Sequence, residues 1–302
     1  MPGAKRRVLS AGRAVNAIRK AAVAGTWYPG SPSALRSAID RHLAAVDRDV
    51  DGDLLALIAP HAGLTYSGSV AAHAYHLLRG RTFDVAVLVG PSHFVGFEGV
   101  SIVRAGGFET PLGAAPIDTA VANALIAATP VVHEYPAAHS REHSIEMQLP
   151  FLTHVAPKVP IVPMVMGYQT DHTARALAGA LERALAGRRA LLIASTDLSH
   201  YHEATSAAAL DAVVTDCVAR FDADALQDAL SRTPEHACGG GPTVAVMRAA
   251  WMLGARDAVV LHYADSGDVS GDKSAVVGYM AAALGRFKSV TTEDTMDTEV
   301  QS

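Results

Sequence analysis

The sequence is poor in cysteine, in aromatic residues and in long apolar runs, and each shortage excludes a class of protein. Its 302 residues include two cysteines, too few for the disulfide framework of a small secreted domain. No run reaches the ~18 apolar residues that a membrane-spanning helix needs. Only 6% of the residues are aromatic, but 50% are hydrophobic, which excludes a disordered chain. We therefore expect a cytoplasmic, globular protein with a deep core.

Positive charge is also scarce, and it is unevenly placed. The chain has 25 basic and 30 acidic residues and a net charge of −5. Residues 1–20 contain six basic and no acidic side chains, so the remainder is more acidic than the average suggests. We therefore expect neither a nucleic-acid partner nor an anionic membrane.

Three parts are expected along the chain. Residues 1–20 form a flexible basic N-terminal extension, 21–286 a single domain, and 287–302 a flexible acidic C-terminal tail. The Arg-rich start also fits a mitochondrial presequence, but Arg and Ala are abundant throughout, so we favour a solvated extension. The tail has little apolar surface to bury, and no linker or internal repeat divides the domain.

Short apolar runs alternate with Ala/Leu-rich segments of helical spacing. The runs are continuous rather than alternating, which is typical of strands buried on both faces. Strand–helix alternation predicts an α/β fold, a three-layer α/β/α sandwich with a mostly parallel, mixed central sheet. The predicted strands are Leu54–Ile58, Val85–Val89, Val100–Val103, Ile161–Met166, Ala190–Ala194, Ala258–Leu261 and Ala275–Val277. The predicted helices are Ala71–Leu78, Thr119–Ala127, Thr173–Leu185, Ala207–Arg220 and Pro242–Leu253.

Polar side chains follow three of these strands where each one ends. The first strand runs into His61 and the second into His93. The strand that ends at Ala194 runs into Asp197 and His200. Ligands of open α/β sheets bind outside the carboxyl ends of the strands. If these strands are parallel neighbours, their polar residues gather along one functional edge.

Cys238 stands in a context that favours a functional role. Three glycines and Pro242 follow it, and proline suits the first turn of a helix. A thiol near the positive end of that helix would have a lowered pKa and form thiolate. The glycines allow a close backbone approach to a ligand or metal. Cys217, inside a predicted helix, is expected to be inert.

Two chemistries remain open for these residues. Two histidines and a cysteine suit a transition metal, because imidazole binds iron, copper and zinc while thiolate favours the softer ions. Three protein ligands leave open positions, as in catalytic or redox sites. The same atoms also suit a nucleophilic Cys238 with a histidine base that Asp197 orients. The sequence does not separate the two.

A second group of polar residues is a weaker candidate. His139, Glu142 and His143 match the H-x-x-E-H pattern of the inverted zinc peptidases, which a His-rich chain can match by chance. We expect Glu142, His143 or Glu146 to reach the functional edge and support the ligands or line a substrate pocket. Asp265, in a Gly/Asp/Ser-rich turn, is expected to orient a ligand there.

Together these motifs resemble the Memo family, whose bacterial and archaeal members are also called AmmeMemoRadiSam system protein B. They occur in the family's order from about Ala24 to Leu284, and the ordered set is specific although each motif alone is weak. The matching stretches are Ala24–Pro29, Ala59–Gly68, Gly90–His93, Thr110–Gly113, Glu142–Pro150, Ser195–Tyr201, Cys238–Gly239 and Tyr263–Lys273.

The resemblance implies a fold similar to that of the class III extradiol dioxygenases. It implies a mononuclear iron or copper ion, with zinc as a third candidate, held by His61, His93 and Cys238. Asp197 and His200 match the family's nearby Asp and His, which we interpret as catalytic acid/base residues. A eukaryotic member is associated with redox signalling and phosphotyrosine peptides. The prokaryotic name implies AMMECR1-type and radical SAM proteins as partners.

We therefore predict a Memo-like metal-binding protein with copper- or iron-dependent, dioxygenase-like oxidoreductase activity on an unidentified small molecule or peptide. One alternative is a non-catalytic binding or metal-handling protein that recognises a peptide or partner protein. A second alternative is a metal-free cysteine hydrolase that uses Cys238.

Overall fold

The computed structural model describes residues 18–288. The predicted acidic tail lies outside these residues from 289 onward, and the predicted basic extension lies outside them up to residue 17. Ile18 and Arg19, at the end of that predicted extension, form strand β1 (Ile18–Arg19), which pairs in parallel with β5 (Gly107–Thr110). Strand β6 (Gly113–Pro116) pairs with the other edge of β5 and completes a small three-stranded sheet.

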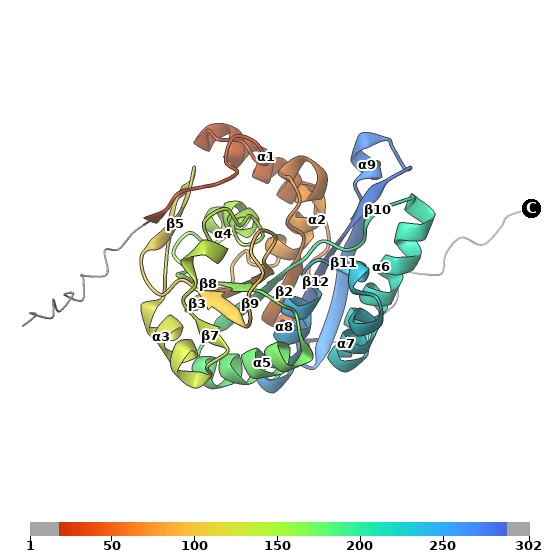
Figure 1. Ribbon diagram of the computed structural model, residues 1–302. Helices are drawn as coiled ribbons and strands as arrows, with labels where there is room; N and C mark the ends of the chain where they lie inside the picture. The colour runs from red at the N-terminus through yellow and green to blue at the C-terminus, as the bar shows by residue number, and fades with distance from the viewer. Residues whose placement is uncertain (1–17, 289–302) are drawn as a thin grey trace, which may run out of the picture.

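A nine-stranded sheet forms the centre of the domain (Figure 1). Its middle strands are β2 (Gly52–Ala59), β9 (Ala190–Ser195), β3 (Val85–Pro91) and β8 (Ile161–Met166), which lie side by side in that order and are all parallel. The outer strands are β4 (Val100–Ile102), β7 (Val132–His133), β10 (His200–His202), β11 (Asp257–Asp265) and β12 (Val276–Phe287). Several of these pair antiparallel with their neighbours. The predicted mixed sheet is confirmed with a parallel middle, and among the described residues four of its eight strand pairings are parallel and four antiparallel.

Helices cover both faces of this sheet, so the α/β sandwich is confirmed as well (Figure 1). One layer contains α1 (Pro32–Ala44), α2 (Leu64–His76) and α4 (Leu149–Val155). The other contains α3 (Thr119–Ala128), α5 (Asp171–Leu185), α6 (Ala204–Ala219), α7 (Ala223–Arg232) and α8 (Gly240–Met252). A short helix, α9 (Gly267–Ser270), lies between β11 and β12.

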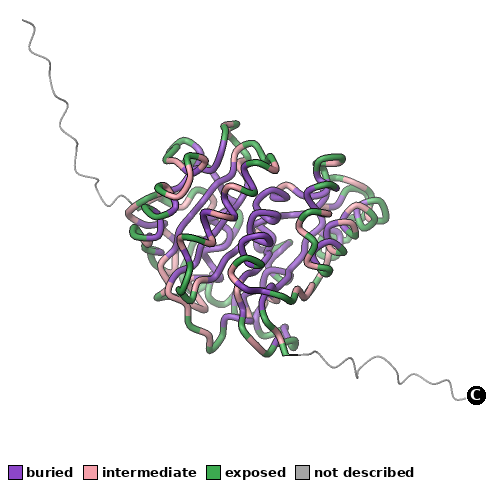
Figure 2. The backbone as a smooth tube through the Cα atoms, turned by 90° about the horizontal axis from the view of Figure 1, so that it is seen from below, coloured by how far each residue is buried: buried purple, intermediate pink, exposed green. Residues whose placement is uncertain are grey.

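Each face of the sheet packs into its own apolar cluster. Alternate residues of the middle strands belong to opposite clusters, for example Ile58 to one and Leu57 to the other. Figure 2 shows the buried residues concentrated in the sheet and on the inner helix faces. The continuous apolar runs therefore reflect burial on both faces rather than the half-buried surface of an exposed sheet.

Some elements differ from the prediction. Helix α2 begins at Leu64, well before the predicted Ala71. The predicted strand Ala275–Val277 is the start of the 12-residue β12, whose Ala-rich centre has low intrinsic strand propensity. The segment is a strand because it pairs with neighbours on both edges, with β11 on one and with β2 and β10 on the other. No helix among the described residues is long and apolar enough to cross a membrane.

Candidate metal centre

The candidate centre lies at the carboxyl edge of the middle strands. His61 follows β2 and His93 follows β3, and both strands flank β9 in parallel. Cys238 comes from the turn before α8. One nitrogen of each histidine and the sulfur of Cys238 all lie within 4.8 Å of one another. The structure therefore brings together three donor atoms from three loops.

The protonation of His61 is fixed by its neighbours. Its Nδ1 lies 2.9 Å from the Ser195 hydroxyl, which donates its one proton to the Ser144 carbonyl at 2.7 Å. Ser195 also accepts from the Gln148 amide at 2.7 Å. Because the hydroxyl has no second proton to give, Nδ1 of His61 is the donor and Nε2 keeps its lone pair. That Nε2 lies 3.2 Å from Sγ of Cys238, and burial lowers the pKa of His61 well below its usual value.

His93 is oriented by Glu142. The ring Nδ1 of His93 donates to this carboxylate at 2.8 Å, and its backbone N–H donates at 2.7 Å. Burial alone would raise the pKa of Glu142, but these bonds and the charge of His93 lower it to about 2. His93 keeps a free Nε2, and 27% of its side chain is exposed. This is the arrangement of a carboxylate that orients a ligating imidazole.

His93, Glu142 and His143 also lie close enough to share an ion. The carboxylate of Glu142, however, already accepts four bonds, two from His93 and one each from the backbone N–H groups of His143 and Ser144. Its oxygens have little capacity left for a cation. We therefore assign Glu142 to the orientation of His93 rather than to a second metal set.

The pKa of the Cys238 thiol differs from the one that its sequence context predicts. Burial, with the nearby carboxylate of Asp197, raises the pKa of Cys238 above its usual range. The predicted lowering of this pKa by the start of α8 is therefore wrong, because the loss of solvation raises the pKa by more than the helix end lowers it. A neutral thiol is a poor nucleophile, whereas a bound metal ion deprotonates a coordinating thiol outright.

Asp197 lies directly behind His61. Its Oδ1 accepts the backbone N–H groups of His61 at 2.7 Å and Ala62 at 3.3 Å, and Oδ2 lies 3.9 Å from His61 Nε2. Burial raises the pKa of Asp197. Its backbone N–H also approaches Cys238 Sγ at 3.3 Å. Asp197 thus contacts both a histidine and the cysteine of the centre.

His200 lies at the start of β10, across the same edge. Its Nδ1 donates to the Leu198 carbonyl at 2.8 Å, which leaves Nε2 free. A cavity of 400 Å³ lies between His200 and Cys238. Its other lining residues are His202, Pro234 and Glu235. His200 is therefore placed to meet a molecule that enters beside Cys238.

Three neighbouring rings form one wall of the centre, one pair of them stacked and the other tilted. The ring of His143 lies 4.3 Å from that of His93 at an interplanar angle of 19°, and Trp27 lies 4.3 Å from His143. Burial is the main cause that lowers the pKa of His143 to about 4, and the neighbouring imidazoles of His93 and His61 disfavour a positive charge there as well. Trp27 is not among the predicted site residues, although it lies inside the first matching motif, Ala24–Pro29.

Glu146 and Asp265 do not join the donor atoms. Glu146 is fully buried and binds the N-terminal segment that carries Trp27: it accepts the guanidinium of Arg19 at 2.6 Å, two backbone N–H groups and the Tyr28 hydroxyl. Asp265 pairs with Lys273 at 2.9 Å in the turn between β11 and β12. Both therefore hold chain segments together.

The H-x-x-E-H match does not form a peptidase helix. Residues 139–145 have no helical assignment, so His139 and His143 do not share a helix face. His139 instead contacts the Ser101 hydroxyl at 3.0 Å.

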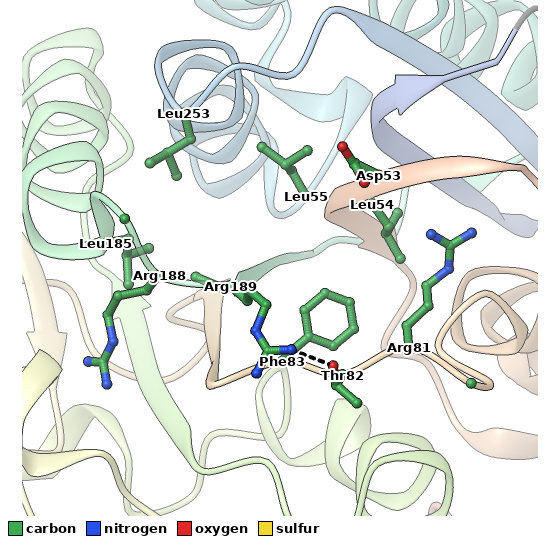
Figure 3. A pocket seen from close by; sticks show the side chains of 13 residues that line it. Asp53, Leu54, Leu55, Arg81, Thr82, Phe83, Leu185, Arg188, Arg189 and Leu253 are labelled. Carbon is green, nitrogen blue, oxygen red and sulfur yellow. Dashed lines mark hydrogen bonds between the residues drawn. The ribbon is translucent and has the colours of Figure 1, made fainter.

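A larger cavity lies at the opposite, amino edge of the sheet (Figure 3). It measures 640 Å³ and contains three arginines, which do not point toward one another. Arg189 binds Thr82 at 2.8 Å, and Arg81 binds backbone carbonyls. Arg188 pairs with Asp118 at 3.5 Å. This cavity therefore lacks a convergent set of groups for a ligand.

Comparison with known proteins gives the family. The family model described as Memo-like protein matches residues 19–283. A MEMO1 family protein of Methanothermobacter thermautotrophicus is 39% identical over 276 residues, covering 87% of this chain and 98% of the relative. One from Methanosarcina mazei is 38% identical over 267 residues, with the same coverage. A third, from Nitrosopumilus maritimus, is 32% identical over 271 residues.

Among solved structures, an uncharacterized protein of Escherichia coli K12 has a TM-score of 0.50 at 17% identity, covering 77% of this chain and 100% of that one. At this identity the likeness concerns the fold alone. The sequence similarity, in contrast, extends over nearly the full length of the relatives and includes the loops that carry His61, His93 and Cys238. The chain therefore belongs to the Memo family.

Proposed function

We propose that this protein binds one iron or copper ion through His61, His93 and Cys238 and uses it in a dioxygenase-like redox reaction. The substrate class is a small molecule or peptide that enters at the carboxyl edge of the sheet. The observation that carries the proposal is the convergence of two imidazole nitrogens and one sulfur within 4.8 Å of one another.

The donor chemistry fits such an ion. Both histidines direct their other ring nitrogen to a fixed partner, Ser195 for His61 and Glu142 for His93. Metal-binding histidines almost always have such a partner, because it sets the tautomer and the ring orientation. Imidazole suits iron, copper and zinc, and thiolate favours the softer of these ions.

Open space beside the donors supports a reactive site rather than a closed structural one. Three protein ligands leave positions for a substrate, whereas structural metal sites use four. The partly exposed side of His93 and the 400 Å³ cavity beside Cys238 provide that space. Bound iron or copper would supply the electron transfer that the side chains themselves lack.

Asp197 and His200 are proposed as the acid/base residues. Burial raises the pKa of Asp197, which favours a carboxyl that can hold a proton. His200 has a free Nε2 next to the cavity. Together they offer a proton acceptor and donor within reach of a molecule beside Cys238.

The raised pKa of the Cys238 thiol counts against metal-free hydrolysis. Such a hydrolase needs Cys238 as a thiolate before substrate binds, but burial raises the pKa of this thiol.

Elemental analysis of protein purified without a His tag tests the proposal. Wild type should carry a stoichiometric amount of iron or copper, and Cys238→Ser should lose most of it. Cys217→Ser is the matched control, because Cys217 is buried in α6 and makes no contact with the centre. Equal metal in wild type and Cys238→Ser, or zinc as the sole metal, would contradict a redox centre that uses this cysteine. Stoichiometric metal without turnover on any substrate would favour a metal-handling role.

A further inference from the structure

The turn that carries Cys238 is held from two sides. On the inner side, the Cys238 backbone N–H donates to the Asp197 carbonyl at 3.2 Å, and Gly239 N–H donates to the Thr196 hydroxyl at 3.0 Å. A Cβ on Gly239 would lie 2.3 Å from the Ser195 carbonyl oxygen. The inner side of the turn is therefore pressed against the end of β9.

On the outer side, one side chain spans the whole turn. The Gln169 amide nitrogen donates to the Cys238 carbonyl at 2.7 Å, and its amide oxygen accepts the Gly241 N–H at 2.7 Å. The backbone partners leave no ambiguity in the orientation of the amide, because one is an acceptor only and the other a donor only. An amide side chain supplies a donor and an acceptor on two separate atoms without carrying a charge.

The packing around Gln169 shows how closely the turn approaches it. A Cβ on Gly241 would lie 2.7 Å from Cβ of Gln169 and 2.9 Å from the sulfur of Met166. A larger residue would not fit at this position, so the backbone of Gly241 lies directly against the side chain of Gln169. This contact sets the distance between the end of β8 and the start of α8.

The segment that carries Gln169 is itself fixed to the loop of His93. Tyr168 N–H donates to the Phe97 carbonyl at 2.8 Å, and Gly167 N–H donates to the Gly99 carbonyl at 2.9 Å. A continuous path of hydrogen bonds therefore leads from the loop after β3, through Gln169, to the carbonyl of Cys238.

We infer that Gln169 is a positioning residue, which holds the sulfur of Cys238 at its place beside His61 and His93. The expected effect on metal binding rests on the function proposed above, whereas the expected effect on the reactivity of the Cys238 thiol does not. Gln169 also lines a cavity of 430 Å³ that borders Cys238 and Gly241. Without its side chain the turn loses its outer support and opens toward this cavity.

Alkylation of the metal-free protein by iodoacetamide, followed by peptide mapping, tests this inference. The loss of the two hydrogen bonds from Gln169 to the turn should raise the reaction rate of Cys238 in Gln169→Ala by a factor of about 5 to 150. Gln169→Glu retains the acceptor for Gly241 but loses the donor to Cys238, so the rate should rise there too. Cys217 serves as an internal reference in every sample, because its own rate should not change.

Tyr168→Phe is the matched control. It removes a hydroxyl from the same segment and the same cavity and leaves the contacts to the turn intact, so Cys238 should react at the wild-type rate. A wild-type alkylation rate in both folded Gln169 variants would overturn the inference, and circular dichroism establishes that they are folded.

Titration with Co²⁺ provides the spectroscopic readout. The near-ultraviolet sulfur-to-cobalt band reports whether Cys238 is a ligand. We expect about tenfold weaker Co²⁺ binding and a weaker band in Gln169→Ala, with both unchanged in Tyr168→Phe. A wild-type protein that binds no Co²⁺ would refute the proposed metal function, whereas faster alkylation in the Gln169 variants would still support the positioning role.

Discussion

The carboxyl and amino edges of the central sheet differ in how their polar side chains are buried and hydrogen-bonded. At the carboxyl edge, His61, Asp197 and Glu142 are buried, and each has a fixed set of hydrogen-bond partners. At the amino edge, Arg189 is largely exposed and its partner Asp84 partly exposed, and the arginines around the cavity diverge (Figure 3). The cavity at the amino edge is nevertheless the larger, 640 Å³ against 400 Å³ beside Cys238.

This contrast teaches that convergence of functional groups identifies a site better than the size of a cavity. Buried polar groups need partners, and those partners fix their protonation and direction. Exposed ion pairs are screened by water and salt, so they impose little order on their surroundings. Four measurements test this difference between the two edges.

The largest change in unfolding free energy is expected at Glu146, which binds the N-terminal segment to the carboxyl edge. Glu146→Ala leaves Arg19, two backbone N–H groups and the Tyr28 hydroxyl without their acceptor. Breaking a buried pair of this kind costs about 3–5 kcal/mol of unfolding free energy, measurable by urea denaturation. Glu109→Ala is the control, because Glu109 pairs with Lys20 of the same segment at the surface. Equal stability of the two variants would contradict the contrast between buried and exposed pairs.

Acid should lower the unfolding free energy of the protein through His139. Burial, with the charge of Arg19, lowers the pKa of His139 to about 4. Below the ordinary histidine pKa of about 6.5, the unfolded chain takes up a proton that the folded protein refuses, so stability falls as the pH falls. The loss approaches about 3 kcal/mol below pH 4. Between pH 7.5 and 4.5, the unfolding free energy of His139→Gln should depend less steeply on pH than that of wild type. The same slope in both proteins would refute the low pKa of His139.

A smaller effect is expected from Glu142→Gln. The change removes the carboxylate that accepts Nδ1–H of His93, and loss of such a partner typically weakens metal binding about 10- to 100-fold. Competition with a chelator measures the affinity. Glu134→Gln, on an exposed carboxylate paired with Arg104, is the control. Wild-type affinity in Glu142→Gln would mean that His93 needs no orienting partner.

The smallest effect is expected at the amino edge. Arg189→Ala removes contacts to Asp84 and Thr82, both at the surface. Neither the melting temperature nor the metal content should change measurably. A loss of metal in this variant would show that the two edges are coupled, and the comparison would then fail.

Much of the carboxyl edge followed from the sequence for a simple physical reason. Parallel strands buried on both faces appear as continuous apolar runs, and their carboxyl ends meet at one edge. The polar residues after β2, β3 and β9 therefore lie together. That these residues bind a metal stays a prediction, which the experiments above address.

Other features depend on contacts between residues far apart in the chain. Gln169 lies in a short segment without a distinctive motif, and its role depends on a turn 69 residues away. Glu146 belongs to a family motif, but its partners lie more than 110 residues earlier. The length of β12 likewise depends on its strand partners rather than on its Ala-rich sequence. Local patterns carry no information about such partners.

The contact between Trp27 and His143 also gives the protein a built-in optical probe. The chain has two tryptophans, and the other, Trp251, packs against Phe221 and Arg256 on the α8 side of the sheet. A Trp251→Phe protein would therefore fluoresce from a single indole, which is separated from His93 by the one ring of His143. Its emission could follow events at the carboxyl edge in solution, in real time and without an attached dye.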